Sequence, residues 1–71
     1  MFYKIKKINE KDEVSYLSKI GWDKDKELIA EFQSDPFEAL SHEDIQVIKA
    51  FRDLIFKETP IRNIEIIQDK L

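Results

Sequence analysis

The absence of cysteine is the feature that most limits how this chain of 71 residues can fold. A chain of this length buries only about 60% of the surface that its unfolded form exposes, and its core rarely supplies more than about 3 to 5 kcal/mol. Small domains usually add disulfides, a structural metal or a partner, and both disulfides and thiolate zinc sites need cysteine. Self-association remains as the supplement. We therefore expect one domain, residues 1–71, that forms a homodimer.

Apolar residues make up 42% of the chain, which is enough to predict a folded core although 38% of the residues are charged. No apolar run approaches the roughly 18 residues that cross a bilayer. Residues 1–8 mix lysines with apolar side chains and lack the continuous apolar stretch of a secretion signal. We expect a cytoplasmic protein, and the Lys-, Ile-, Asp- and Glu-rich composition is typical of an AT-rich bacterial or phage genome.

The two ends of the chain alternate apolar and polar side chains, which predicts strands. Residues 1–8 place Tyr3 and Ile5 on one face of an extended segment, and residues 61–67 repeat the alternation around Ile64. The sequence therefore predicts a strand at each end.

Residues 9–21 predict a helix between about Glu10 and Ile20. Asn9 suits its N-cap, with Asp12 three residues later, and Gly21 suits a left-handed turn at its end. The residues expected on its inner face recur at three-residue steps and are Val14, Leu17 and Ile20.

A second helix is predicted over residues 24–33, because Asp23 offers an N-cap and the segment is mostly good helix formers. Its inner residues would be Leu28, Ile29 and Phe32. A strand remains an alternative, since Leu28, Ala30 and Phe32 also alternate.

The third and best helical pattern starts near Ser41, with Asp44 three residues later, and ends before Pro60. Thr59 is expected to be extended, because proline disfavours the helical region for the residue before it. Asp35 and Pro36 predict a short helical turn before this helix. The inward residues of the third helix are expected to be Ile45, Ile48, Phe51 or Arg52, and Ile55.

Together these patterns predict an α+β fold. It is a small single domain with an N-terminal strand, two or three helices, and a C-terminal strand that pairs in a small sheet. We expect Phe51 and Ile55 in the core, and Trp22 at least partly exposed beside Gly21.

Catalytic chemistry finds little support in the sequence. The single histidine, His42, follows Ser41 and precedes Glu43 and Asp44, but neighbours on a helix point about 100° apart and cannot converge on one substrate. We expect no catalytic residue and a protein that is not an enzyme.

Metal and cofactor sites are also not expected. Residues 23–27 imitate the start of a calcium loop, but Leu28 and Ser34 stand where that loop needs glycine and glutamate. One histidine without cysteine argues against zinc, and a single glycine excludes phosphate-binding glycine loops.

Charge is distributed unevenly along the chain. Residues 23–44 carry eight acids against Lys24 and Lys26, a net charge of −6, whereas residues 1–22 carry +2 and residues 45–71 carry +1. Segregated acid steers association with a basic partner, although acids at helix starts also complement the helix dipole. The residues predicted to form the partner-binding surface are Trp22, Asp23, Asp25, Glu27, Glu31, Asp35 and Glu38.

The expected function is a non-catalytic protein-binding module, an inhibitor or modulator of a basic bacterial protein such as a nucleic-acid-binding protein. A phage-type DNA mimic is its most specific form. As a helix, 22 residues span about 33 Å, over which duplex DNA carries about 19 phosphate charges. A charge of −6 is thin by comparison, so mimicry would need a dimer.

Two other functions stay open. The first is a structural or regulatory subunit that docks through an apolar surface. The second is a nucleic-acid binder that uses the strand of Lys4, Lys6 and Lys7, although these lysines also suit the protection of a sheet edge. Direct binding of nucleic acid and membrane is not expected, because the chain has a net charge of −3 and no apolar span.

Overall fold

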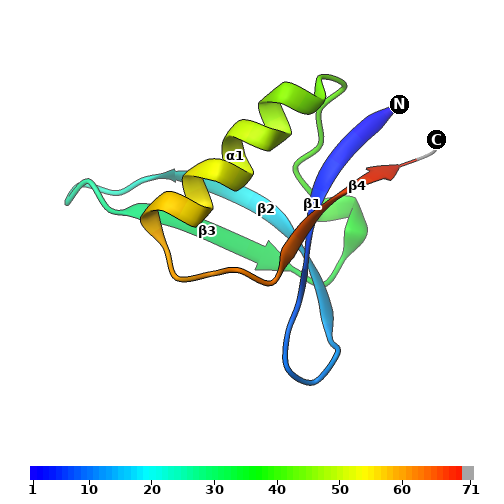
Figure 1. Cartoon of the computed structure of the whole chain (residues 1–71), viewed down its shortest axis with the longest axis horizontal. Helices are drawn as coiled ribbons and strands as arrows, with labels where there is room; N and C mark the ends of the chain where they lie inside the picture. Colours follow the sequence, from blue (N-terminus) through cyan, green and yellow to red (C-terminus); the bar gives the residue numbers. More distant parts are fainter. Residues whose placement is uncertain (70–71) are drawn as a thin grey trace.

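The computed structural model describes residues 1–69, which form one antiparallel sheet and one long helix (Figure 1). The strand order is β3-β2-β1-β4, so β1 is central and β3 and β4 are the edge strands. The elements in chain order are β1 (Phe2–Ile8), β2 (Val14–Trp22), β3 (Leu28–Gln33), the 3₁₀ helix η1 (Pro36–Glu38), α1 (Ile45–Glu58) and β4 (Ile64–Asp69).

The predicted fold class is wrong in its helix count. The described residues contain one α-helix, not two or three, and four strands instead of two. The segment predicted as a helix over residues 10–20 contains β2, and residues 24–33 contain β3. For residues 24–33, the alternation of Leu28, Ala30 and Phe32 also allowed a strand, and the strand is correct.

A β-bulge explains the false helix in residues 10–20. Leu17 lies opposite Phe32 and Lys19 lies opposite Glu31, so Ser18 is an extra residue in β2. A bulge shifts the alternation of side chains by one position. Leu17 and Ile20 therefore both pack in or against the core, three residues apart, as they would on a helix.

Gly21 also plays a different part from the one predicted. It lies within β2 opposite Ile29, and its φ is not positive. No heavy atom lies within 4 Å of where its Cβ would be. A side chain at this position would therefore meet open space, and the glycine does not end a helix.

The second half of the chain follows the sequence patterns more closely. Helix α1 is capped by Asp44, whose Oδ1 accepts a hydrogen bond of 2.9 Å from the backbone N–H of Gln46, so the helix starts later than a Ser41 cap implies. It ends at Glu58, and Thr59 is extended before Pro60, as predicted. Strand β4 (Ile64–Asp69) starts inside the predicted range of residues 61–67 and extends past its end.

Helix α1 covers one face of the sheet and encloses the core (Figure 1). Ile55 is fully buried and Phe51 packs against the buried cluster, so both are core residues as predicted. The described residues include no helix that is both long and apolar enough to cross a membrane. The fully buried side chains are Ile5, Leu17, Ile48 and Ile55.

The opposite face of the sheet, called the open face below, carries the side chains that alternate with these core residues. In the middle of the sheet it includes Lys4, Lys6 and Tyr16, and on β3 it includes Ile29 and Glu31. Helix η1 packs against β2.

Candidate partner-binding surface

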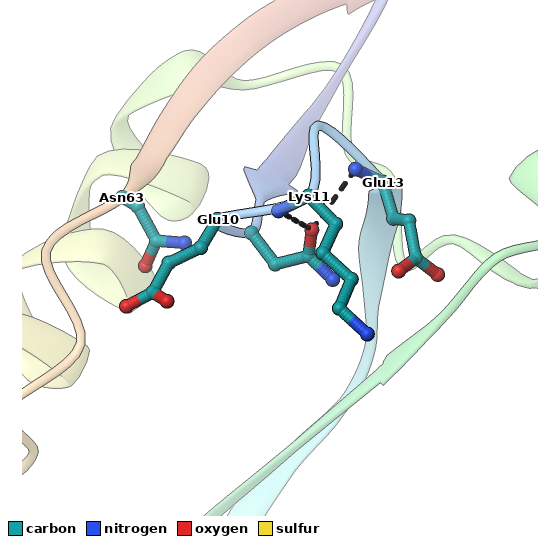
Figure 2. Close-up of a pocket in the computed structure, with 5 residues that line it drawn as sticks. Glu10, Lys11, Glu13 and Asn63 are labelled. Atoms are coloured by element: carbon teal, nitrogen blue, oxygen red, sulfur yellow. Dashed lines mark hydrogen bonds between the residues drawn. The ribbon is translucent and has the colours of Figure 1, made fainter.

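Two turns of the same geometry join β1 to β2 and β2 to β3. In each, one side-chain oxygen, Asn9 Oδ1 or Asp23 Oδ1, accepts two backbone N–H hydrogen bonds of 2.9 Å (Figure 2 shows the first turn). Asparagine and aspartate favour such turns for the same reason that they cap helices, because their short side chains bond nearby backbone N–H groups. Both residues were predicted as helix caps, and both start hairpin turns. The donors are Lys11 and Glu13 in the first turn, and Asp25 and Glu27 in the second.

The fourth residue of each turn has a left-handed backbone. The φ angle is 59° at Asp12 and 62° at Lys26. A three-residue hairpin loop typically contains one such position, which glycine fills at no steric cost. Neither turn has a glycine there, so both hold a conformation that disfavours larger side chains.

The end of the sheet at the second turn gathers five of the seven predicted binding residues. Trp22, the last residue of β2, is 53% exposed, as predicted. The turn after it carries Asp23, Asp25 and Glu27, and Glu31 follows on β3, where it is exposed. Trp22 lies opposite Leu28 on the face that carries the core, whereas Glu31 is on the open face. We call this region, residues 22–31, the β2–β3 end.

Ile29 belongs to this region and was not predicted as a binding residue. It is 41% exposed on the open face. The helical interpretation of residues 24–33 placed Ile29 inward beside Leu28, whereas the alternation of a strand places these neighbours on opposite faces. The alternative strand pattern was thus the signal that identifies Ile29 as a surface residue.

Asp35 and Glu38 lie elsewhere. They follow the other end of β3, and a strand of six residues extends about 20 Å. Asp35 caps η1, as predicted, since its Oδ1 accepts a hydrogen bond of 2.9 Å from Phe37 N–H. The predicted binding residues therefore form two groups and not one continuous surface.

Lys4 is buried on the central strand. Its Nζ lies 3.0 Å from Asp69 Oδ2 and 5.0 Å from the centre of the Tyr16 ring, and the residue is only 7% exposed. Its charge is thus balanced by a carboxylate on β4. Because β1 is a central strand, its lysines do not protect a sheet edge.

The other two lysines of β1 are also engaged. Lys6 Nζ lies 2.9 Å from Glu65 Oε1, and Lys7 Nζ lies 4.4 Å from the centre of the Phe32 ring. Cation–π contacts and ion pairs of this kind hold the ammonium groups within the fold. The strand of lysines is therefore not arranged as an open basic groove.

His42 has a structural contact within the chain. Its Nδ1 accepts a hydrogen bond of 2.9 Å from Asp44 N–H, and its backbone pairs with Tyr3. Over residues 1–69, no group of three or more His, Cys, Asp or Glu residues is arranged to hold a metal ion.

A hollow with a volume of about 440 Å³ lies beside the first turn (Figure 2). The carboxylates of Glu10 and Glu13 point to opposite sides of this turn. They do not form an acid–base pair. The lining residues are Asn9, Glu10, Lys11, Glu13 and Asn63.

Comparisons with models of protein families, with curated proteins and with solved structures find no match to this chain.

Proposed function

We propose that the protein is a non-catalytic binding module that docks on a basic protein through the β2–β3 end. The observation that supports this most is the half-exposed Trp22 at the base of a turn with three carboxylates. The chain has one tryptophan, and residues 1–69 contain only four fully buried side chains. Tryptophan is enriched among the residues that dominate binding energy at protein interfaces, so its exposure here fits an anchor.

Charge around Trp22 supports a basic partner. The described residues form three ion pairs, Lys4–Asp69, Lys6–Glu65 and Arg52–Asp53, and none involves the β2–β3 end. Asp23, Asp25, Glu27 and Glu31 outweigh Lys24 and Lys26, which gives residues 22–31 a net charge of −2. A polar rim around an apolar anchor is the usual composition of a protein interface, and unpaired carboxylates steer it toward positive charge.

The charge at this end also limits the proposal. A net charge of −2 suits a basic patch around an apolar pocket and is far below that of a nucleic-acid site. Inhibition of a nucleic-acid-binding protein by mimicry remains the most specific form of the proposal, and it requires two copies of the chain.

A structural or regulatory subunit that docks by apolar contacts is the second candidate. Three exposed apolar side chains favour it: Trp22 at 53%, Ile29 at 41% and Phe37 at 94% exposure. Binding led by charge weakens as ionic strength rises, whereas apolar binding does not. Salt dependence therefore separates the two candidates.

The experiment compares two charge-reversed variants. Asp25→Lys, Glu27→Lys and Glu31→Lys together alter the β2–β3 end and leave Asp23 to hold its turn. Glu10→Lys, Asp12→Lys and Glu13→Lys make the same charge change at the geometrically matched first turn, and lysine is compatible with the left-handed position because Lys26 occupies its equivalent. Basic proteins from a bacterial lysate are captured by the parent, and association rates are then measured for all three chains.

The proposal predicts that both variants fold, by circular dichroism, and that only the first loses the captured partner. Association should slow by about tenfold or more at low salt, because steering depends on the summed field of the charges. Equal binding by the first variant and the parent would contradict docking through the carboxylates and favour the apolar candidate. Equal loss in both variants would show that only net charge matters.

A further inference from the structure

Strand β3 has one edge that no strand pairs with over residues 1–69. Asp23 N–H donates to Glu27 O at 3.0 Å across the hairpin, and hydrogen-bonded pairs alternate along antiparallel strands. Ile29 and Glu31 therefore direct their backbone groups to β2, which agrees with the hydrogen bond of 3.1 Å from Ser18 Oγ to Glu31 O. The residues whose backbone N–H and C=O face outward are Leu28, Ala30 and Phe32.

We propose that β3 pairs antiparallel with β3 of a second copy of this chain, with Ala30 opposite Ala30 of the partner subunit. The two sheets then form one continuous sheet of eight strands. This alignment uses every outward-facing residue, because Leu28 lies opposite the partner's Phe32 and the reverse. Such a contact is isologous, the usual symmetry of a homodimer.

The alternative alignments are less favourable. A shift by two residues in one direction places Glu31 opposite the partner's Glu31, and the opposite shift places Glu31 opposite the partner's Glu27. Like charges directly opposite each other destabilise a pair of strands. Each shift also leaves one outward-facing residue of β3 without a strand partner. The alignment centred on Ala30 avoids both costs.

Charge at the strand ends does not select the occupant of this edge. The alignment brings the second turn, with Lys24 and Lys26 but also Asp25, toward the partner segment that carries Asp35. Strand β3 itself indicates a second copy, because it is self-complementary in this alignment. Its apolar residues Leu28 and Phe32 lie opposite one another, and no like charges face each other within the strand.

Pairing along the edge leaves the open face accessible. Ile29, half exposed in the single chain, comes to lie opposite the partner's Glu31. The pairing uses backbone groups, so it does not depend on the basic partner proposed above. It also places two β2–β3 ends in one particle, which doubles the carboxylates that a partner would meet.

The test is sedimentation equilibrium from micromolar to millimolar concentration, on the parent and two substitutions at one exposed position. Ile29→Lys places an ammonium group opposite each copy of Glu31, and Ile29→Glu places like charges there. Because the symmetric contact occurs twice, we expect the two variants to differ by about tenfold in dimer dissociation constant, with Ile29→Glu the weaker. A parent that is an 8.5 kDa monomer throughout overturns the proposal.

The sign of the effect tests the alignment. Equal weakening by Ile29→Lys and Ile29→Glu would indicate Ile29 opposite itself, and no effect of either would indicate that β3 is not the contact. Both results overturn the proposal. The double variant Ile29→Glu with Glu31→Lys restores opposite charges and should recover the parent's dissociation constant within about threefold.

Ala30→Pro gives an independent measurement. Its N–H faces outward, so proline removes no hydrogen bond to β2 but blocks the central contact between copies. We expect a folded monomer by circular dichroism and sedimentation. A dimer as tight as the parent's would contradict the proposal, and if this variant does not fold, the Ile29 pair decides.

Discussion

The two halves of the sheet treat charge in opposite ways. On β1 and β4, Lys4 and Lys6 each lie within 3.0 Å of a carboxylate. On β2 and β3, none of the charged side chains forms an ion pair within residues 1–69, and Trp22 and Ile29 are exposed on opposite faces of the sheet. The first half satisfies its own charges and apolar side chains, whereas the second half leaves charged and apolar side chains exposed.

The same contrast holds for the two edge strands. Glu65 and Asp69 of β4 each balance a lysine of β1, and the apolar residues of β4 are at least partly buried. On β3, Glu31 forms no ion pair with any of residues 1–69, and Ile29 is exposed. An edge with few charges and an exposed apolar residue is the one that pairs with a further strand most readily. The difference indicates why β3, and not β4, is the proposed contact.

The largest expected difference in stability comes from replacing isoleucine by alanine in each half of the sheet. Ile5→Ala removes a fully buried side chain and should cost about 2 to 5 kcal/mol, comparable to the whole stability of a domain of this size. Ile29→Ala should change the free energy of unfolding by about 0.5 kcal/mol or less. Urea unfolding at low protein concentration measures both, and equal losses would show that Ile29 is packed within the single chain.

The charged residues offer a second, smaller contrast. Asp69→Asn removes the counter-ion of a lysine whose side chain is only 8% exposed. The Asp69 side chain is itself 39% exposed. We therefore expect the free energy of unfolding to fall by about 1 kcal/mol, which is near the low end of the cost of leaving a buried polar group without its partner.

Adding Lys4→Met to that variant should recover part of the loss, since the unpaired charge is then gone. Glu31→Gln on β3 should cost about 0.5 kcal/mol or less. If Glu31→Gln destabilises the fold as much as Asp69→Asn, the two halves do not differ in how they use charge.

The two turns give the smallest expected effects. Lys26→Gly relieves a left-handed backbone that lysine disfavours, and should stabilise the fold by about 0.5 to 1 kcal/mol after the greater entropy of glycine in the unfolded chain is subtracted. Asp12→Gly should give less, because aspartate tolerates this conformation better than lysine. The midpoint of urea unfolding should therefore rise more for Lys26→Gly than for Asp12→Gly. A larger rise for Asp12→Gly would contradict the equivalence of the two turns.

The sequence was most informative where one physical signal had one interpretation. Pro60 has no N–H and clashes with a continuing helix, so the end of α1 was predictable. Asp35 before Pro36 likewise predicted the start of η1. Asn9 and Asp23 were ambiguous, because the same side-chain bond to the backbone starts a helix or a hairpin turn.

The remaining errors have a common physical origin in pairing between strands. The bulge at Ser18 depends on how β2 meets β3, and it gives Leu17 and Ile20 a helical spacing. The ion pair of Lys4 with Asp69 joins residues 65 positions apart, and only the pairing of β1 with β4 brings them together. Trp22 is exposed as predicted, although Gly21 beside it is part of β2 and the turn follows Trp22, whereas the exposure of Ile29 required knowing that β3 is a strand.

The most direct test of the β2–β3 end as the docking surface is a backbone amide NMR spectrum of the protein, recorded with and without the basic protein that it captures. We expect the largest shifts in the Trp22 indole N–H and in the amides of residues 22–31, with small shifts over residues 64–69 of β4. The matched charge reversal at the first turn should leave this pattern unchanged. The largest shifts on β1 and β4, with Trp22 unaffected, would contradict the account.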